Sequence, residues 1–311
     1  MTRDTPIPPT STASLREKYL DPKALMSLGG LLIRAKSVVE GAIAGMHRSP
    51  HKGSSVEFAE YKEYTPGDEI KHIDWKAFGK FDKYYVKQFE DETNLRAYLL
   101  LDGSGSMDFA SEDNVTKLVF AQTLAASIAY LLLRQGDAVG AMIFDDKPGL
   151  LLPPSSKTSH LTDLLHVLEH LEGSGRTDIA GAMSAMAERL RRRGLLIIIS
   201  DLLDDAERVM SIARVMRKRR QEVAIFHIID PAELDLPYEG LTVFEGLEGE
   251  EDLLVDPDDI RDRYREEMQE HLDLISRSCR DGDIEYFQVQ TTQPLEQVLL
   301  DFVVGRIQLR V

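Results

Sequence analysis

Aspartates follow four apolar runs in this chain, each at or just beyond the point where the run ends. They are Asp102, Asp145, Asp146, Asp201, Asp204, Asp205 and Asp230. Carboxylates that gather in one place repel one another unless a cation or good hydrogen bonds offset the repulsion. Hard oxygen ligands of this kind favour magnesium, manganese or calcium over zinc. The chemistry to look for is therefore the binding of a hard divalent cation.

These runs alternate with helical patterns, which tells us how the aspartates are positioned. The expected strands are 95–101, 138–144, 195–200, 223–229 and 284–289, and the expected helices are 115–134, 158–171, 179–192, 206–219 and 295–307. Short apolar strands that alternate with helices indicate a mostly parallel, doubly wound α/β sheet, a three-layer Rossmann-type architecture. Ligands of such sheets bind beyond the carboxyl ends of the strands, so we expect these aspartates to share one rim.

The second half adds two features. Residues 241–245 and 252–255 predict a hairpin, and a long helix follows it. Asp256 is the expected N-cap of that helix and Pro257 its first residue, with further acids at the positive end of the helix dipole.

The loop after the first expected strand reads Asp102-Gly103-Ser104-Gly105-Ser106, and Thr177 lies at a later loop-to-helix junction. With Asp201 at a strand end, this resembles the metal-ion-dependent adhesion site (MIDAS) of von Willebrand factor A (vWA) domains, whose pattern is D-x-S-x-S, then Thr, then Asp. The resemblance implies that one Mg²⁺ or Mn²⁺ is held by Asp102, Ser104, Ser106, Thr177 and Asp201. It also implies that a carboxylate of a protein partner fills the open coordination position.

Four further acids flank the same loops and are candidate partner-binding residues; they are Asp145, Asp178, Asp204 and Asp205.

The five candidate ligands also have a simpler explanation. The serines, Thr177 and Asp201 could serve only to cap helices, a role in which such residues are common.

Further segments resemble a narrower family, the bacterial domain of unknown function 58, over about residue 30 to the C-terminus. Those before the first strand are Glu57-Phe58, Tyr61-Lys62-Glu63-Tyr64, Pro66-Gly67-Asp68-Glu69, Ile73-Asp74-Trp75-Lys76-Ala77 and Val86-Lys87-Gln88-Phe89-Glu90. Those in the C-terminal half include Phe244-Glu245-Gly246-Leu247-Glu248, Val255-Asp256-Pro257, Thr291-Thr292 and Pro294-Leu295. Members of this family pair the N-terminal segment with an A-type domain.

The family is usually encoded beside MoxR-type AAA+ ATPases. The resemblance implies an adaptor or co-chaperone that links such an ATPase to a client. We therefore expect a non-enzymatic, metal-dependent protein-binding module. Two alternatives stay open: a Mg- or Mn-dependent hydrolase that uses the same acidic rim, and a structural protein whose rim is held by hydrogen bonds alone.

Three regions are expected along the chain. Residues 1–14, rich in Thr, Ser and Pro, predict a flexible tail, and 15–92 form the family-specific N-terminal segment, which we expect to pack on the main domain. That segment predicts a helix over about 15–45 and a strand over 83–89. Pro66-Gly67-Asp68 predicts a turn, and Trp75 a buried anchor. Residues 93–311 form the vWA-like domain.

The amino-acid composition limits the kinds of partner and the kinds of fold that we expect for this protein. The 311 residues include 53 acids against 37 Lys and Arg, a net charge of −16, which disfavours nucleic acid and anionic membrane surfaces. The single cysteine, Cys279, excludes an internal disulfide framework and is expected in the core. The apolar run 118–133 is shorter than the roughly 20 residues of a spanning helix and predicts a buried one. We expect a cytoplasmic protein.

Two other motifs are weighed against this interpretation. His166-Val167-Leu168-Glu169-His170 matches the inverted zinc-protease pattern, but the leucine stripe of its helix places both histidines on the solvent side. The runs Arg191–Arg193 and Arg217–Arg220 end helices just before strands, where cations complement the helix dipole. They should lie opposite the acidic rim, where an anionic partner could dock.

Overall fold

The computed structural model describes residues 30–46, 61–63, 85–87, 95–112, 114–190 and 192–309. The chain divides into two compact units, Met1–Met46 with Leu95–Val311, and His47–Asn94. In the smaller unit, β1 (Tyr61–Glu63) pairs antiparallel with β2 (Tyr85–Lys87). The expected tail at 1–14, the turn at Pro66-Gly67-Asp68 and the Trp75 anchor lie outside the described residues.

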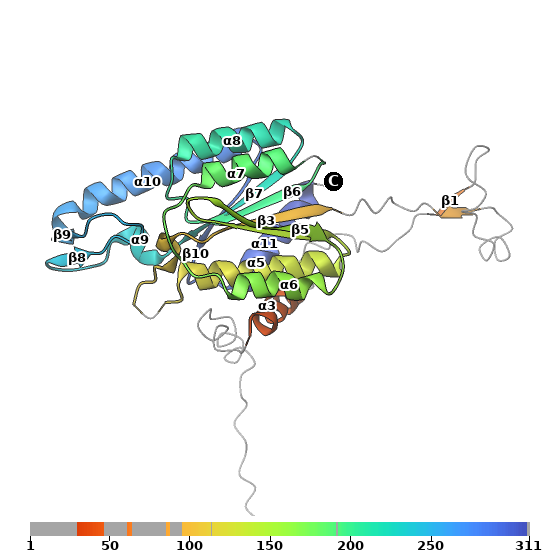
Figure 1. The fold of residues 1–311 in the computed structure, drawn as a ribbon, viewed down its shortest axis with the longest axis horizontal. Coiled ribbons are helices and arrows are strands. Elements are labelled where there is room, and N and C mark those ends of the chain that lie inside the picture. The colour runs from red at the N-terminus through yellow and green to blue at the C-terminus, as the bar shows by residue number, and fades with distance from the viewer. Residues whose placement is uncertain are drawn as a thin grey trace, which may run out of the picture. The chain divides into compact units, whose positions relative to one another are not determined.

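The larger unit is built on a six-stranded sheet in the order β10-β7-β6-β3-β4-β5 (Figure 1). Its strands are β3 (Arg96–Asp102), β4 (Ala138–Phe144), β5 (Pro148–Ser155), β6 (Leu195–Ser200), β7 (Glu222–Ile229) and β10 (Glu285–Gln290). All neighbours pair parallel except β4 and β5, which pair antiparallel. The mostly parallel sheet expected from the apolar runs is confirmed.

Helices cover both faces of the sheet because the side chains of each strand alternate between two cores. Leu99 and Leu101 face one core, and Leu100 faces the other. The first core is covered by α3 (Leu31–Met46), α5 (Lys117–Arg134), α6 (His160–Glu169) and α11 (Leu295–Leu309). The second is covered by α7 (Ile179–Arg189), α8 (Ala206–Lys218) and α10 (Pro257–Asp281), which lie on the opposite side in Figure 1.

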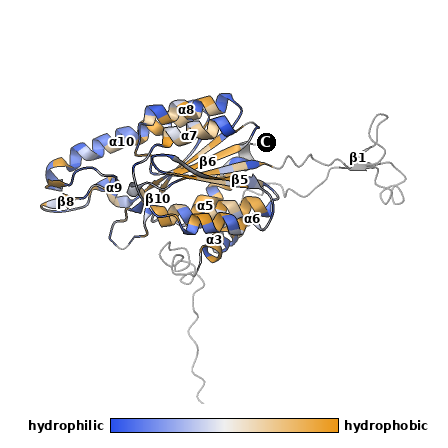
Figure 2. Cartoon of the chain, viewed as in Figure 1, coloured by the Kyte–Doolittle hydropathy of each residue, from blue (hydrophilic) through white to orange (hydrophobic). Residues whose placement is uncertain are grey.

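Helix α5 is the central helix of the first core. Within the described residues it is the one helix long and apolar enough to cross a membrane, yet 78% of that stretch is buried inside the fold. Figure 2 shows the hydrophobic colour concentrated on this helix and on the strands, whereas α10 is hydrophilic along most of its length. The burial expected for residues 118–133 is therefore confirmed.

Helix α3, which the prediction placed in the N-terminal segment 15–92, packs on α5 and α11 within the unit that holds the large sheet. Two elements of the structure were not predicted. Strand β5 was not predicted: its prolines argue against a central strand, but they are tolerated at the sheet edge where it lies. The short helix α9 (Pro231–Asp235) was also not predicted.

The predicted hairpin is present as β8 (Thr242–Phe244) and β9 (Leu253–Val255), which pair antiparallel. Helix α10 follows it directly. Asp256 is its N-cap and accepts a hydrogen bond from the Asp258 N–H, with Pro257 as the first helical residue, as predicted.

Candidate functional site

The structure brings all five predicted ligand side chains together beyond the carboxyl ends of β3 and β6. Asp102 is at the centre: its Oδ1 accepts the Ser104 N–H at 3.0 Å, and its Oδ2 accepts the Thr177 hydroxyl at 3.2 Å. The Ser104 and Ser106 hydroxyl oxygens lie 3.1 Å apart, and the Ser106 side chain hydrogen-bonds to Asp201. Thr177, Asp102, Ser104, Ser106 and Asp201 thus form one connected hydrogen-bonded series.

Burial and chemistry of this series fit a hard cation. Both aspartates and both serines are buried, and Thr177 is half-buried. A hydroxyl that donates its proton to a carboxylate keeps its oxygen lone pairs for another contact. Two carboxylates and three hydroxyls therefore supply the oxygen donors that Mg²⁺ or Mn²⁺ prefers, although their role as ligands stays a prediction.

Helix capping does not explain these residues. Helix α7 is capped by Asp178, which accepts the Gly181 N–H at 2.9 Å, and α8 is capped by Asp205, which accepts the Arg208 N–H at 3.0 Å. Ser104 precedes the single 3₁₀ turn η2 (Gly105–Asp108), but its side chain makes no capping bond there. The capping positions next to Thr177 and Asp201 are thus filled by their neighbours.

The four acids predicted to bind a partner have local roles in this structure. Asp178 and Asp205 are the caps just described, and Asp178 also pairs with Arg208. One carboxylate oxygen of Asp204 accepts the Ala180 N–H at the start of α7, while Asp145 accepts the Lys147 N–H. A role in partner binding stays a prediction for all four.

Lys117, at the start of α5, is a site residue that sequence reasoning missed. Its side chain is fully buried, and its ammonium lies 2.7 Å from Asp201 Oδ2 and 2.5 Å from Glu233 Oε1. Burial disfavours the charged forms of both partners, but the ion pair prevails: it raises the pKa of Lys117 and lowers the pKa of Asp201. Asp201 therefore carries its charge inside the protein.

Asp102 is in the opposite situation. Burial and the nearby Asp201 carboxylate raise its pKa to about 7, against which its hydrogen bonds from Ser200 and Ser104 act. When Asp102, Asp201 and Glu233 are all ionised, three negative charges face the one positive charge of Lys117, an imbalance of two. One divalent cation beside Asp102 would balance that difference.

Asp230 and Glu233 hold the surroundings of Lys117 in place. Asp230 is fully buried; its carboxylate accepts the Ser111 hydroxyl at 2.5 Å and the Thr291 hydroxyl at 3.3 Å. Glu233 closes a capping box on α9 by accepting the Asp230 N–H at 2.7 Å. The rim acid Asp230 thus joins the loops after β3, β7 and β10, and Glu233 links it to Lys117.

Next to Asp201 lies a buried histidine, His227. One of its ring nitrogens is 2.9 Å from the Tyr286 hydroxyl, and it also hydrogen-bonds to the backbone of Asp201. Burial lowers the pKa of His227 to about 3, so the ring is neutral at physiological pH.

The backbone just after Asp201 adopts an uncommon conformation. Leu202 has a φ of 55°, a left-handed conformation uncommon for leucine.

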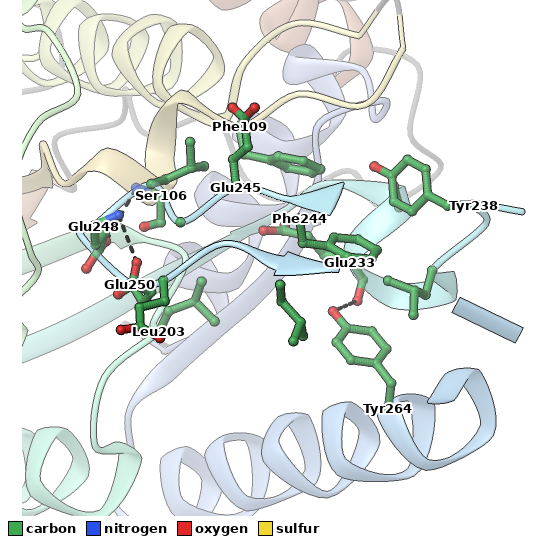
Figure 3. Close-up of a pocket in the computed structure, with 16 residues that line it drawn as sticks. Ser106, Phe109, Leu203, Glu233, Tyr238, Phe244, Glu245, Glu248, Glu250 and Tyr264 are labelled. Carbon is green, nitrogen blue, oxygen red and sulfur yellow. Dashed lines mark hydrogen bonds between the residues drawn. The ribbon is translucent and has the colours of Figure 1, made fainter. Parts of the chain in front are cut away.

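The tip of the β8–β9 hairpin reaches this site, which sequence reasoning did not anticipate. Glu248 Oε1 accepts the Ser106 N–H at 3.3 Å, and Oε2 accepts the Thr177 N–H at 3.0 Å. Figure 3 shows Glu248 beside Ser106, with Glu250 below it and the aromatic side chains of Phe109, Tyr238 and Phe244 further along. These residues line a groove of about 440 Å³ between the hairpin and the rim.

The residues of the discounted zinc-protease pattern lie at the end of α6. His166 and His170 are exposed, as predicted, with ring centroids 4.2 Å apart. In the part of the chain that the structure describes, no three His, Cys, Asp or Glu side chains form a metal-binding group. The predicted cation site contains only two carboxylates, and its other donors are hydroxyls.

Cys279 is buried in the second core, as predicted, and burial raises its pKa to about 12.

A family model described as "Protein of unknown function DUF58" matches residues 60–273, more than half of the chain. The chain belongs to the DUF58 family. This confirms the family resemblance seen in the sequence, and the larger unit of this DUF58 protein has the mostly parallel α/β sheet expected for it.

Among curated relatives, the DUF58 chain is 26% identical over 297 residues to the uncharacterized protein Mb1516 of Mycobacterium bovis, covering 94% of this chain and 92% of the relative. It is similar in structure to the hypothetical protein BatB of Bacteroides thetaiotaomicron, with a TM-score of 0.46 and 16% identity over 68% of this chain and 98% of that one. A von Willebrand factor type A structure from Catenulispora acidiphila has a TM-score of 0.33 and 13% identity, covering 44% of this chain and 33% of that one.

Proposed function

We propose that this DUF58 protein is a non-enzymatic, metal-dependent protein-binding module. In this proposal Asp102, Ser104, Ser106, Thr177 and Asp201 hold one Mg²⁺ or Mn²⁺. The observation that carries the proposal is the connected, mostly buried series of oxygen donors that these five residues form at the strand ends. The bound cation would supply an electrophilic position for one carboxylate of a partner.

Lys117 supports a carboxylate as the partner group. Its ammonium pairs with Asp201 and Glu233, so Asp102 is the carboxylate among the five residues that Lys117 does not pair with. A cation held by two carboxylates, one of them paired with an ammonium, keeps attraction for another anionic oxygen. The Ser and Thr hydroxyls contribute donor oxygens without adding charge.

The surface around the site supports a protein as the partner. Large apolar side chains are exposed on and beside the hairpin; they are Leu203, Leu241, Val243, Leu247, Leu253 and Leu254. Clustered exposed apolar side chains mark interaction sites more often than other surface. The proposed partner thus presents an Asp or Glu flanked by apolar residues.

Membership of the DUF58 family supports a proposal about the cellular partner of this protein. We infer that the chain is an adaptor or co-chaperone of a MoxR-type AAA+ ATPase in the cytoplasm, because the family resemblance implies such an ATPase. The net charge of −16 fits a protein partner better than a nucleic acid.

We favour a binding module over a hydrolase because His227, the histidine beside Asp201, is buried. A metal-dependent hydrolase needs a general base that can reach substrate. His227 is buried, and it hydrogen-bonds to Tyr286 and to the backbone of Asp201. A phosphatase and peptidase screen with Mg²⁺ and Mn²⁺ tests this point: turnover that disappears in Asp201→Ala would favour the hydrolase.

The metal site is tested by titrating Mn²⁺ into the full chain by calorimetry. We expect one site in the native protein, its loss in Asp102→Asn, and unchanged binding in the control Asp146→Asn. Asp146 also follows β4 at the rim, but it is exposed and pairs with the exposed Lys147. Equal binding by all three proteins would contradict the assignment of the ligands.

Partner binding is tested by affinity capture with the same proteins immobilised. The proposal expects proteins that are retained in Mg²⁺ by the native chain and by Asp146→Asn, and that are lost with EDTA or in Asp102→Asn. Retention that survives both EDTA and Asp102→Asn would overturn metal-dependent binding.

A further inference from the structure

The carboxylate of Glu248 lies where two of the candidate ligand loops meet. It accepts one hydrogen bond from the backbone of Ser106 and one from the backbone of Thr177, at 3.3 and 3.0 Å. Both of these residues also carry a hydroxyl of the proposed cation site. An anionic group is thus already held by backbone donors of two residues of that site, and Figure 3 shows it beside Ser106.

The hairpin tip is fitted to this position by its backbone as well. A Cβ on Gly105 would lie 2.1 Å from the Leu247 carbonyl oxygen, so only glycine permits this approach. The Glu248 carbonyl accepts the Arg176 Nε–H at 3.2 Å, and the Glu248 N–H donates to Glu250 at 3.0 Å. The contacts orient the Glu248 side chain toward the site.

We propose that Glu248 is an intrinsic carboxylate ligand of the metal site and occupies the position that a partner's carboxylate takes. The inference rests on the proposed function, since it assigns the occupant of the same coordination position. It adds that the free protein is self-capped and that a partner must displace the hairpin tip.

The rest of the hairpin is suited to displacement. Its strands have three residues each, and Val243, Leu253 and Leu254 expose more than half of their surface. The groove beneath it separates part of the hairpin from the body of the domain. No residue of the hairpin belongs to either core, so moving the tip leaves both cores intact.

The test compares Mn²⁺ binding by the native chain, Glu248→Gln and the control Glu251→Gln, with and without acetate. Glu251 is exposed in the same loop, so the control makes the same change of charge. We expect Glu248→Gln to weaken Mn²⁺ binding on the order of tenfold, because affinity depends on the charge of the ligand set. Acetate should restore that loss and leave the native protein and Glu251→Gln unchanged.

Hydrogen exchange gives a reading that does not depend on the metal. The Ser106 and Thr177 amides should exchange faster in Glu248→Gln than in Glu251→Gln, because their acceptor is weakened. If Mn²⁺ binding and exchange are the same in both variants, while Asp102→Asn still abolishes binding, the role of Glu248 is wrong and the proposed function stands. If the native chain binds no Mn²⁺ at all, both fall.

Discussion

Charged side chains are more deeply buried at the carboxyl ends of the six-stranded sheet than at its amino ends. At the carboxyl ends, Asp102, Asp201 and Lys117 are buried and contact one another through a dense polar network. At the amino ends, the charges are only partly removed from water: Arg193 is 75% exposed and pairs with Glu222, which is 25% exposed and also pairs with Arg306. In the second basic run, Arg217 pairs with Asp283 and the Arg219 guanidinium donates to the Ala187 carbonyl.

This difference bears on the proposed function, because burial of charge has a cost that exposed charges avoid. Buried ion pairs seldom stabilise a fold more than apolar side chains of the same size would, because removing charge from water is costly. Exposed pairs contribute little in either direction. The proposed cation would account for a buried cluster at the rim in which carboxylates outnumber the ammonium, whereas the pairs at the amino end need no such explanation.

The largest expected effect is at the rim, for Lys117→Met. The substitution keeps the length of the side chain but leaves Asp201 and Glu233 without their buried counter-charge. We expect the free energy of unfolding to fall by about 3–5 kcal/mol, the range for a broken buried pair. Denaturant unfolding of the full chain measures it.

Lys147→Met is the matched control for that experiment. Lys147 is 80% exposed and pairs with the exposed Asp146, so its loss should change stability by less than about 0.5 kcal/mol. Similar losses for both lysines would show that the rim network is no more coupled than the surface.

A second effect at the rim comes from the cation itself. If Mn²⁺ binds the folded protein alone, a concentration one hundred times its dissociation constant raises the free energy of unfolding by about 2.7 kcal/mol. The same addition should do nothing for Asp102→Asn. Thermal unfolding with and without Mn²⁺ measures this; a gain in the variant equal to that of the native protein would place the cation elsewhere.

At the amino end, a smaller effect should appear as acid sensitivity. Burial opposes ionisation of Glu222, but Arg306 and Arg193 hold its pKa below the ordinary value of 4.5. Because the folded-state pKa is the lower one, the stabilisation is complete above 4.5 and is lost as the pH falls through the folded-state value. Glu222→Gln should therefore be less sensitive to acid than the native protein in unfolding experiments between pH 5 and pH 3. An unchanged pH dependence would show that these pairs contribute nothing.

The sequence was most informative where one local signal determined the structure. Strands β4 and β6 match their predicted bounds because each is a continuous apolar run. The spacing in Asp102–Ser106 placed three oxygen side chains in one loop, and the resemblance to a metal-ion-dependent adhesion site added Thr177 and Asp201 to the candidate site. The capping box of α9 was overlooked, although Asp230, Pro231 and Glu233 have its characteristic spacing.

The rest depended on tertiary contacts. Lys117 looks like an ordinary polar residue at a helix start, and its burial follows from the meeting of the loops after β6 and β7. Glu248 cannot be distinguished by spacing from its acidic neighbours Glu245, Glu250 and Glu251. Only the fold of the hairpin over the rim places this one carboxylate between the Ser106 and Thr177 amides.

The smallest change in stability is expected at the amino end of the sheet, for Arg193→Ala. Arg193→Ala removes one contact, at 2.9 Å, from Glu222, which keeps its 2.6 Å pair with the mostly buried Arg306. We expect the free energy of unfolding to change by less than about 0.5 kcal/mol, because one exposed guanidinium is well solvated in either state. Denaturant unfolding at low and at high salt measures the change. A loss of about 2 kcal/mol that salt does not reduce would mean that charge at the two ends of the sheet is equally coupled to the fold.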